Sequence, residues 1–144
     1  MSDHSVKLIV AVALLVHGLG HGGALAALMW IAARPGTDTG GWLAARSWLV
    51  PSLPASTATT VASIFWILSL TGFVVTALPF WGVPVPGQAW RLLAVASALV
   101  STAGIVLFVG RWPMFNTLAA LGVNAAVLLA VFWFHWPPHT LFGR

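Results

Sequence analysis

The first long apolar run of this chain reads VKLIVAVALLVHGLGHGGALAALMWIAA, from Val6 to Ala33, and it decides the fold class. It is about 28 residues long, more than the roughly 20 that an α-helix needs to cross a bilayer. In its middle, His17 and His21 are four residues apart and therefore share one face of a helix, with glycines beside them. The run predicts a membrane-spanning helix that carries two histidines at bilayer depth.

A cleaved signal peptide is the alternative for this run. Lys7 resembles the charged start of such a peptide, and Ala24, Leu25 and Ala26 resemble a cleavage site. The apolar run continues well past that point, to Ile31, and is longer than the usual core of a signal peptide. We therefore expect a retained helix.

The composition excludes a water-soluble surface. Of 144 residues, 60% are hydrophobic and 6% are charged, whereas soluble domains are about 25% charged. The net charge of +4 comes from six scattered basic residues, which is too sparse for a nucleic-acid interface or a polybasic lipid-binding cluster. The absence of cysteine excludes disulfides, thiolate metal ligands, covalent haem attachment and cysteine nucleophiles.

Three further apolar runs, each ended by a proline- or glycine-rich segment, complete the domain. With the first run they predict helices at about 6–33, 57–80, 88–110 and 114–136. Short connections make the last three antiparallel neighbours. The sequence therefore predicts an all-α, polytopic membrane protein in which residues 1–144 form one antiparallel bundle of four transmembrane helices.

The long connection after the first run allows two interpretations. Residues 42–50 are compatible with a short amphipathic helix in the membrane interface, or with an irregular loop anchored by Trp42 and Trp48. Both interpretations stay open at this point.

Tryptophan positions support four spans. Eight of the nine fall near the predicted helix ends, where amphipathic rings favour the membrane interface, and Trp66 alone lies deeper. Both termini are then on one side of the membrane. Basic residues are equally divided between the two sides, so the orientation rests on the usual preference of an uncleaved first helix for a cytoplasmic N-terminus, in a bacterial cytoplasmic membrane.

Polar residues gather at one depth of the predicted bundle. With a rise of about 1.5 Å per residue, His17 and Asn124 each lie about 15 Å from a membrane surface, close to the midplane, and His21 lies one turn from His17. Each of the four helices has polar residues in this layer, the remainder being Ser69, Thr71, Ser101 and Thr102. Because hydrocarbon offers no hydrogen bonds, we expect these groups to point inward and pair.

The histidine stretch admits several site hypotheses. Gly18 and Gly22 either pack the first helix closely against a neighbour or leave room for a flat ligand beside His17 or His21, such as haem or another tetrapyrrole. Two histidines four apart also form a two-ligand clamp for a divalent metal, although the sequence supplies no obvious third ligand. Asn124 is the polar group expected opposite them. The predicted helices have no Asp, Glu or Lys at bilayer depth. Catalytic mechanisms that need an acidic residue or a lysine within the membrane are therefore excluded.

A family resemblance comes from two short segments. The stretch from His17 to His21 looks like the first-helix motif HGLxHxxG of small uncharacterised bacterial four-span membrane proteins. The last helix of those proteins tends to carry an Asn and to end in Trp-Pro, as Asn124 and Trp136-Pro137 do here. The layout is also similar in outline to DoxX-like proteins. The resemblance implies a four-span membrane fold and implies no activity.

Three functions are compatible with these observations. The first is a non-enzymatic protein with a polar midplane network, acting as a binder of an apolar small molecule or as a subunit of a homo-oligomer or larger membrane complex. The second is a protein that binds haem, another tetrapyrrole or a metal through His17 or His21. The third is a small membrane enzyme that acts on a lipid or isoprenoid, with the histidines as acid and base.

Overall fold

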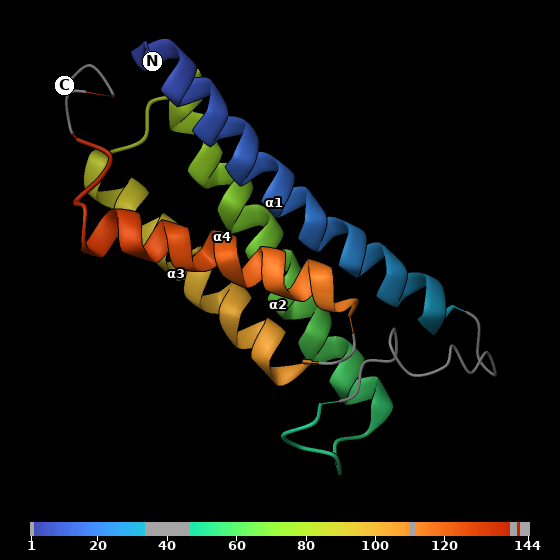
Figure 1. The fold of residues 1–144 in the computed structure, drawn as a ribbon. Coiled ribbons are helices and arrows are strands. Elements are labelled where there is room, and N and C mark those ends of the chain that lie inside the picture. The colour runs from blue at the N-terminus through green and yellow to red at the C-terminus, as the bar shows by residue number, and fades with distance from the viewer. Residues whose placement is uncertain (1, 34–46, 110–111, 139–140, 142–144) are drawn as a thin grey trace.

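Four long helices and one short 3-10 turn make up the computed structural model, which describes residues 2–33, 47–109, 112–138 and 141. The elements are α1 (Asp3–Ala32), α2 (Ala55–Ala77), η1 (Leu78–Trp81), α3 (Gly87–Leu107) and α4 (Met114–Phe132). The helices pack antiparallel, and α1 begins at the end of the bundle where α4 ends (Figure 1). The predicted all-α fold is confirmed.

Each of the last three helices begins directly after a proline. Pro54, Pro86 and Pro113 are the N-caps of α2, α3 and α4, with φ between −55° and −51°. Their carbonyl oxygens accept the first helical hydrogen bonds, at 2.9 to 3.1 Å. A proline is tolerated as the N-cap because no helical hydrogen bond needs its missing N–H, and because its fixed φ fits the extended conformation found here, with ψ between 133° and 141°.

The second helix ends three residues before the predicted boundary of 80. α2 stops at Ala77 and passes into the tighter turn η1, which has Pro79 at its start. Gly82 then closes the turn with φ 87°, a conformation that glycine adopts without steric strain. Proline in the last predicted turn accounts for the change of helix type, because its ring interferes with the preceding helical carbonyl.

The last two helices are also shorter than predicted. α3 ends at Leu107 rather than at 110, and its final carbonyls bind side chains of the preceding connection: Ser47 Oγ donates to Leu107 O at 2.9 Å, and Trp48 Nε1 donates to Val106 O. α4 ends at Phe132 rather than at 136. His135 has a positive φ of 49°, which is incompatible with a continuing helix. Pro137 in addition disfavours a helical conformation of Trp136, the residue before it.

The predicted interfacial helix at 42–50 lies mainly outside the described residues. The described part, residues 47–50, has no helical structure. Its hydrogen bonds to the end of α3 show that this part of the connection is held by the bundle.

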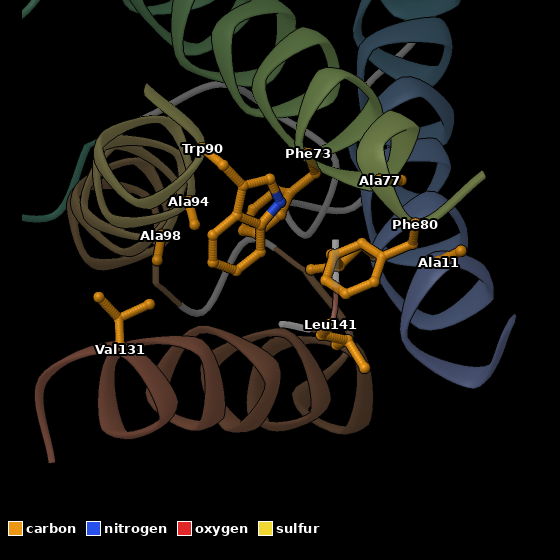
Figure 2. Packing of buried hydrophobic residues seen from close by; sticks show 10 residues of the cluster. Ala11, Phe73, Ala77, Phe80, Trp90, Ala94, Ala98, Val131 and Leu141 are labelled. Carbon is orange, nitrogen blue, oxygen red and sulfur yellow. The ribbon is translucent and has the colours of Figure 1, made fainter. Parts of the chain in front are cut away.

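Two hydrophobic clusters fill the bundle, one toward each end. The first surrounds Phe73, Phe80 and Trp90, and Figure 2 shows their rings between the helices, with Val131 and Leu141 on the α4 side. The second surrounds Trp66 and includes residues of α1, of α2 and of the end of α3 with its C-cap: Leu28, Ala58, Ala62, Ile105 and Phe108. The polar layer lies between these two clusters.

Within the described residues, four helices are long and apolar enough to span a membrane. Large hydrophobic side chains remain exposed along all of them, for example Leu19 on α1, Leu92 on α3 and Phe115 on α4. In water such a surface would aggregate, whereas in a bilayer it contacts lipid. The chain is an integral membrane protein.

Candidate functional site: a polar layer between the helices

Gly18 brings α1 close to α2 and thereby sets the position of the histidines. A methyl group added at Gly18 would lie 3.2 Å from both Leu70 O and Phe73 Cβ, so the two helices meet here almost backbone to backbone. A methyl group at Gly22 would be in ordinary contact with Leu70, at 3.5 Å. Gly18 and Gly22 thus line the α1–α2 contact, as small residues four apart do in membrane helices.

The histidines, one asparagine and two hydroxyl groups form a continuous hydrogen-bond network. His17 Nε2 lies 2.9 Å from Asn124 Oδ1, and Ser101 Oγ lies 3.0 Å from His21 Nε2. Asn124 Nδ2 donates to Ser101 Oγ at 2.8 Å and to Thr102 Oγ1 at 3.1 Å. The network therefore joins α1, α3 and α4, and Asn124 is its centre.

Three of the five members of the network are buried, and two, one of them Thr102, are half-buried. Asn124 and Ser101 are 1% and 0% exposed, and His21 is 5% exposed. His17 is half-buried. Polar groups at this depth must find partners within the protein, and Asn124 does so completely, since its two N–H groups and its carbonyl oxygen are all bonded.

Aromatic side chains of α2 enclose the two imidazoles. The ring of His21 is nearly parallel to those of Trp66 and Phe73, with centroids 5.3 and 6.1 Å away. The ring of His17 meets Phe73 edge-on at 4.4 Å and His21 edge-on at 4.9 Å. Because Trp66 and Phe73 belong to different hydrophobic clusters, the histidines lie where the two clusters meet.

The fourth helix of the predicted layer, α2, contributes no hydrogen bond to this network in the described residues. Thr71 is exposed. Ser69 is fully buried, yet its Oγ has no hydrogen-bond partner, and the same is true of Trp66 Nε1. The expectation that all four helices pair their polar groups therefore holds for three of them.

Among the described residues, the side of the bundle between α1 and α4 has looser backbone packing than the contacts between consecutive helices, and we refer to it as the open side. Backbone packing follows chain order, α1 on α2, α2 on α3 and α3 on α4, whereas α1 and α4 do not pack extensively on each other. The hydrogen bond from His17 to Asn124 bridges this open side. At the end of the bundle where α1 begins, Leu141 joins side chains of α1 and α4 in one cluster.

The residue types at the site limit its chemistry. The described residues contain no group of three His, Cys, Asp or Glu side chains placed to hold a metal ion. The two acidic residues of the sequence, Asp3 and Asp38, lie at the first turn of α1 and outside the four helices. A ligand to either histidine would bind at Nδ1, because both Nε2 atoms are hydrogen-bonded within the network.

Asn124 also prevents the network from passing protons between the histidines. A relay requires each member to accept a proton on one side and release another, as hydroxyl groups and imidazoles do. An amide has separate donor and acceptor atoms and does not exchange their roles. The His17–Asn124–Ser101–His21 path is therefore a fixed arrangement of donors and acceptors.

Comparison with protein-family models, with curated proteins and with solved structures found no match to this chain. The resemblance to four-span proteins with the HGLxHxxG motif thus stays an expectation, and Ala24 stands at the last position of that motif.

Proposed function

We propose that this protein is a non-enzymatic membrane protein that binds an apolar small molecule from the bilayer at the open side between α1 and α4. The observation that carries the proposal is the position of His17, a half-buried polar side chain at mid-bilayer depth on the side of the bundle where the described helices α1 and α4 pack loosely on each other.

The environment of His17 supports this function. Its Nε2 is bonded to Asn124, whereas its Nδ1 has no partner in the described part of the chain. Nδ1 is also not one of the buried atoms without a partner, which are Trp66 Nε1 and Ser69 Oγ. A polar nitrogen that reaches the surface at this depth faces lipid chains, which offer it no hydrogen bond. A bound molecule would supply one.

The first helix leaves space on the same flank. At about 100° per residue, Gly18 points to α2, His21 to α3 and His17 to α4, so Gly20 follows on the uncovered side of His17. Nothing lies within 4 Å of a methyl group built at Gly20. A ligand beside His17 would lie over this glycine.

Replacing Gly20 with leucine tests the proposal. Gly23→Leu is the matched control, because a methyl group at Gly23 also meets nothing within 4 Å, while its position on the helix is turned away from His17. We expect both variants to fold with the thermal stability of the wild type. Solvent extraction and mass spectrometry of protein purified in mild detergent should find a stoichiometric apolar compound in the wild type and in Gly23→Leu, and much less of it in Gly20→Leu.

Two results would contradict the proposal. If the wild type carries only the bulk lipids that any membrane protein retains, there is no such ligand. If a partner protein co-purifies instead and is lost from Gly20→Leu alone, the open side is a subunit interface.

A further inference from the structure

We infer that the two histidines are held as opposite tautomers and that the acceptor nitrogen of His17 recognises a hydroxyl group, so the ligand of the open side is an apolar alcohol. This inference rests on the proposed function and specifies the chemical class of the ligand.

The inference starts from Thr102, which fixes the orientation of the Asn124 amide. The Thr102 hydroxyl donates its hydrogen to Ala98 O at 2.7 Å. Its oxygen is therefore an acceptor toward Asn124, and the atom of the amide that faces it must be the N–H donor, Nδ2. Oxygen and nitrogen of an amide are often interchangeable in a structure, but here the Thr102 hydrogen bond decides between them.

The orientation of Asn124 then determines where each histidine carries its hydrogen. Asn124 Oδ1 faces His17, so Nε2 of His17 must be the donor of that bond. Asn124 Nδ2 donates to Ser101 Oγ, which leaves the Ser101 hydrogen free to be donated to Nε2 of His21. In their neutral forms, His17 thus carries its hydrogen on Nε2 and His21 carries it on Nδ1.

The two remaining ring nitrogens have opposite hydrogen-bonding roles. Nδ1 of His17 is an acceptor and Nδ1 of His21 is a donor, on rings whose centroids are 4.9 Å apart. Neither Nδ1 has a hydrogen-bond partner in the described residues, and neither is among the buried unpartnered atoms. Each nitrogen therefore needs a partner from outside the described chain, one of them a donor and the other an acceptor.

A hydroxyl group supplies the hydrogen that the acceptor Nδ1 of His17 needs. Ethers, ketones and esters accept only, and would leave Nδ1 of His17 unsatisfied. The exposed large hydrophobic side chain of Val16, next to His17 on α1, suits a hydrocarbon body. The chemistry at the site therefore selects an apolar molecule with an alcohol group.

The test compares farnesol with farnesyl methyl ether in nanodiscs that contain the protein. The ether keeps the hydrocarbon body and the acceptor oxygen but cannot donate to His17. We expect the alcohol to bind about fivefold more tightly, the usual effect of one hydrogen bond. In His17→Phe, which keeps an aromatic ring and lacks both ring nitrogens, the two compounds should bind equally.

Nitrogen-15 NMR of histidine-labelled protein gives an independent measurement that does not depend on a variant that folds. We expect the hydrogen on Nε2 of His17 and on Nδ1 of His21, and a shift of the His17 Nδ1 signal when farnesol is added but not when the ether is added. Hydrogens on the same nitrogen in both rings would overturn the inference.

The outcomes separate the inference from the function it rests on. If alcohol and ether bind equally to the wild type, the hydroxyl is not recognised, or a water molecule occupies its place; the inference then fails while the apolar binding site remains. If neither binds, the alcohol class is wrong, and the extraction experiment with Gly20→Leu decides separately whether any ligand exists.

Discussion

Two serines at the same depth of the bundle give a direct test of the polar layer. Ser69 on α2 and Ser101 on α3 are both fully buried. The Ser101 hydroxyl bonds to Asn124 and to His21, whereas the Ser69 hydroxyl has no partner. Replacing each with alanine removes the same single oxygen from equally buried positions, so the difference between the two variants reports the hydrogen bonds alone.

We expect Ser101→Ala to lower the free energy of unfolding by ~1 to 3 kcal/mol. Hydrogen bonds between membrane helices contribute about 0.6 kcal/mol each on average, and two are lost. The Asn124 amide keeps its bond to Thr102, but Nε2 of His21 is left buried without a partner, which adds a penalty of about 1 kcal/mol or more. Ser69→Ala should stay within about 0.5 kcal/mol of the wild type or increase its stability, because it removes a buried polar atom that has no partner.

Reversible unfolding in mixed detergent micelles, followed by tryptophan fluorescence, measures both variants under one condition. Equal losses of stability in the two variants would refute the assigned network. A loss in Ser69→Ala as large as that expected for Ser101→Ala would show that the Ser69 hydroxyl has a partner, such as a buried water that links α2 to the layer.

Three further predictions follow from individual contacts. Gly18→Ala should destabilise the protein by ~1 to 2 kcal/mol in the same unfolding assay, because the added methyl group presses on the backbone of α2, whereas Gly20→Ala should be neutral or stabilising by up to about 1 kcal/mol. Arg91→Gln should speed chymotrypsin cleavage after the aromatic residues that follow α4, since the guanidinium donates to His135 O at 3.0 Å and to a second carbonyl of that segment. Asn124→Asp should lower the free energy of unfolding by ~3 kcal/mol or more and reduce the yield of folded protein on size-exclusion chromatography. An ionised carboxylate would be buried there, and its oxygen would face the lone pairs of a hydroxyl oxygen in place of the amide N–H donor.

Most of the fold could be predicted from the sequence because a bilayer restricts a chain so strongly. An apolar run of more than about 20 residues has to form a helix in a bilayer, because a single segment can pair all of its backbone N–H and C=O groups only as a helix. The starts of three helices were predictable within about two residues because each follows a proline. The ends were less predictable, since α3 and α4 end where side chains or a following proline act on the last turns.

The site could be predicted in part, because the depth of a polar side chain in the membrane limits which other side chains it can bond to. Few polar residues occur in these helices, so those at one depth have few alternative partners, and His17, His21 and Asn124 do meet. Depth does not determine the direction in which a side chain points around its helix. Ser69 and Thr71 are two residues apart and so face nearly opposite directions, and for this reason they cannot both join the layer.

The aromatic surroundings of the histidines had no signal in the sequence. Trp66 and Ser69 lie three residues apart, and Phe73 follows four residues later, so that all three share the buried face of α2. Apolar residues in a membrane helix are equally compatible with lipid and with the bundle interior. Contact with an imidazole is therefore visible only once the helices are packed.

The most consequential feature of the site concerns the positions of hydrogen atoms, which a list of residue types does not contain. His17 and His21 are one helical turn apart in a nearly repeated stretch, yet one faces an amide oxygen and the other a hydroxyl group. The difference originates in Thr102, whose hydrogen is committed to its own helix. A single hydrogen bond from the Thr102 hydroxyl to a backbone carbonyl of α3 orients Asn124, and Asn124 in turn orients both histidines. The recognition properties of α1 therefore depend on a helix that packs on the far side of the layer.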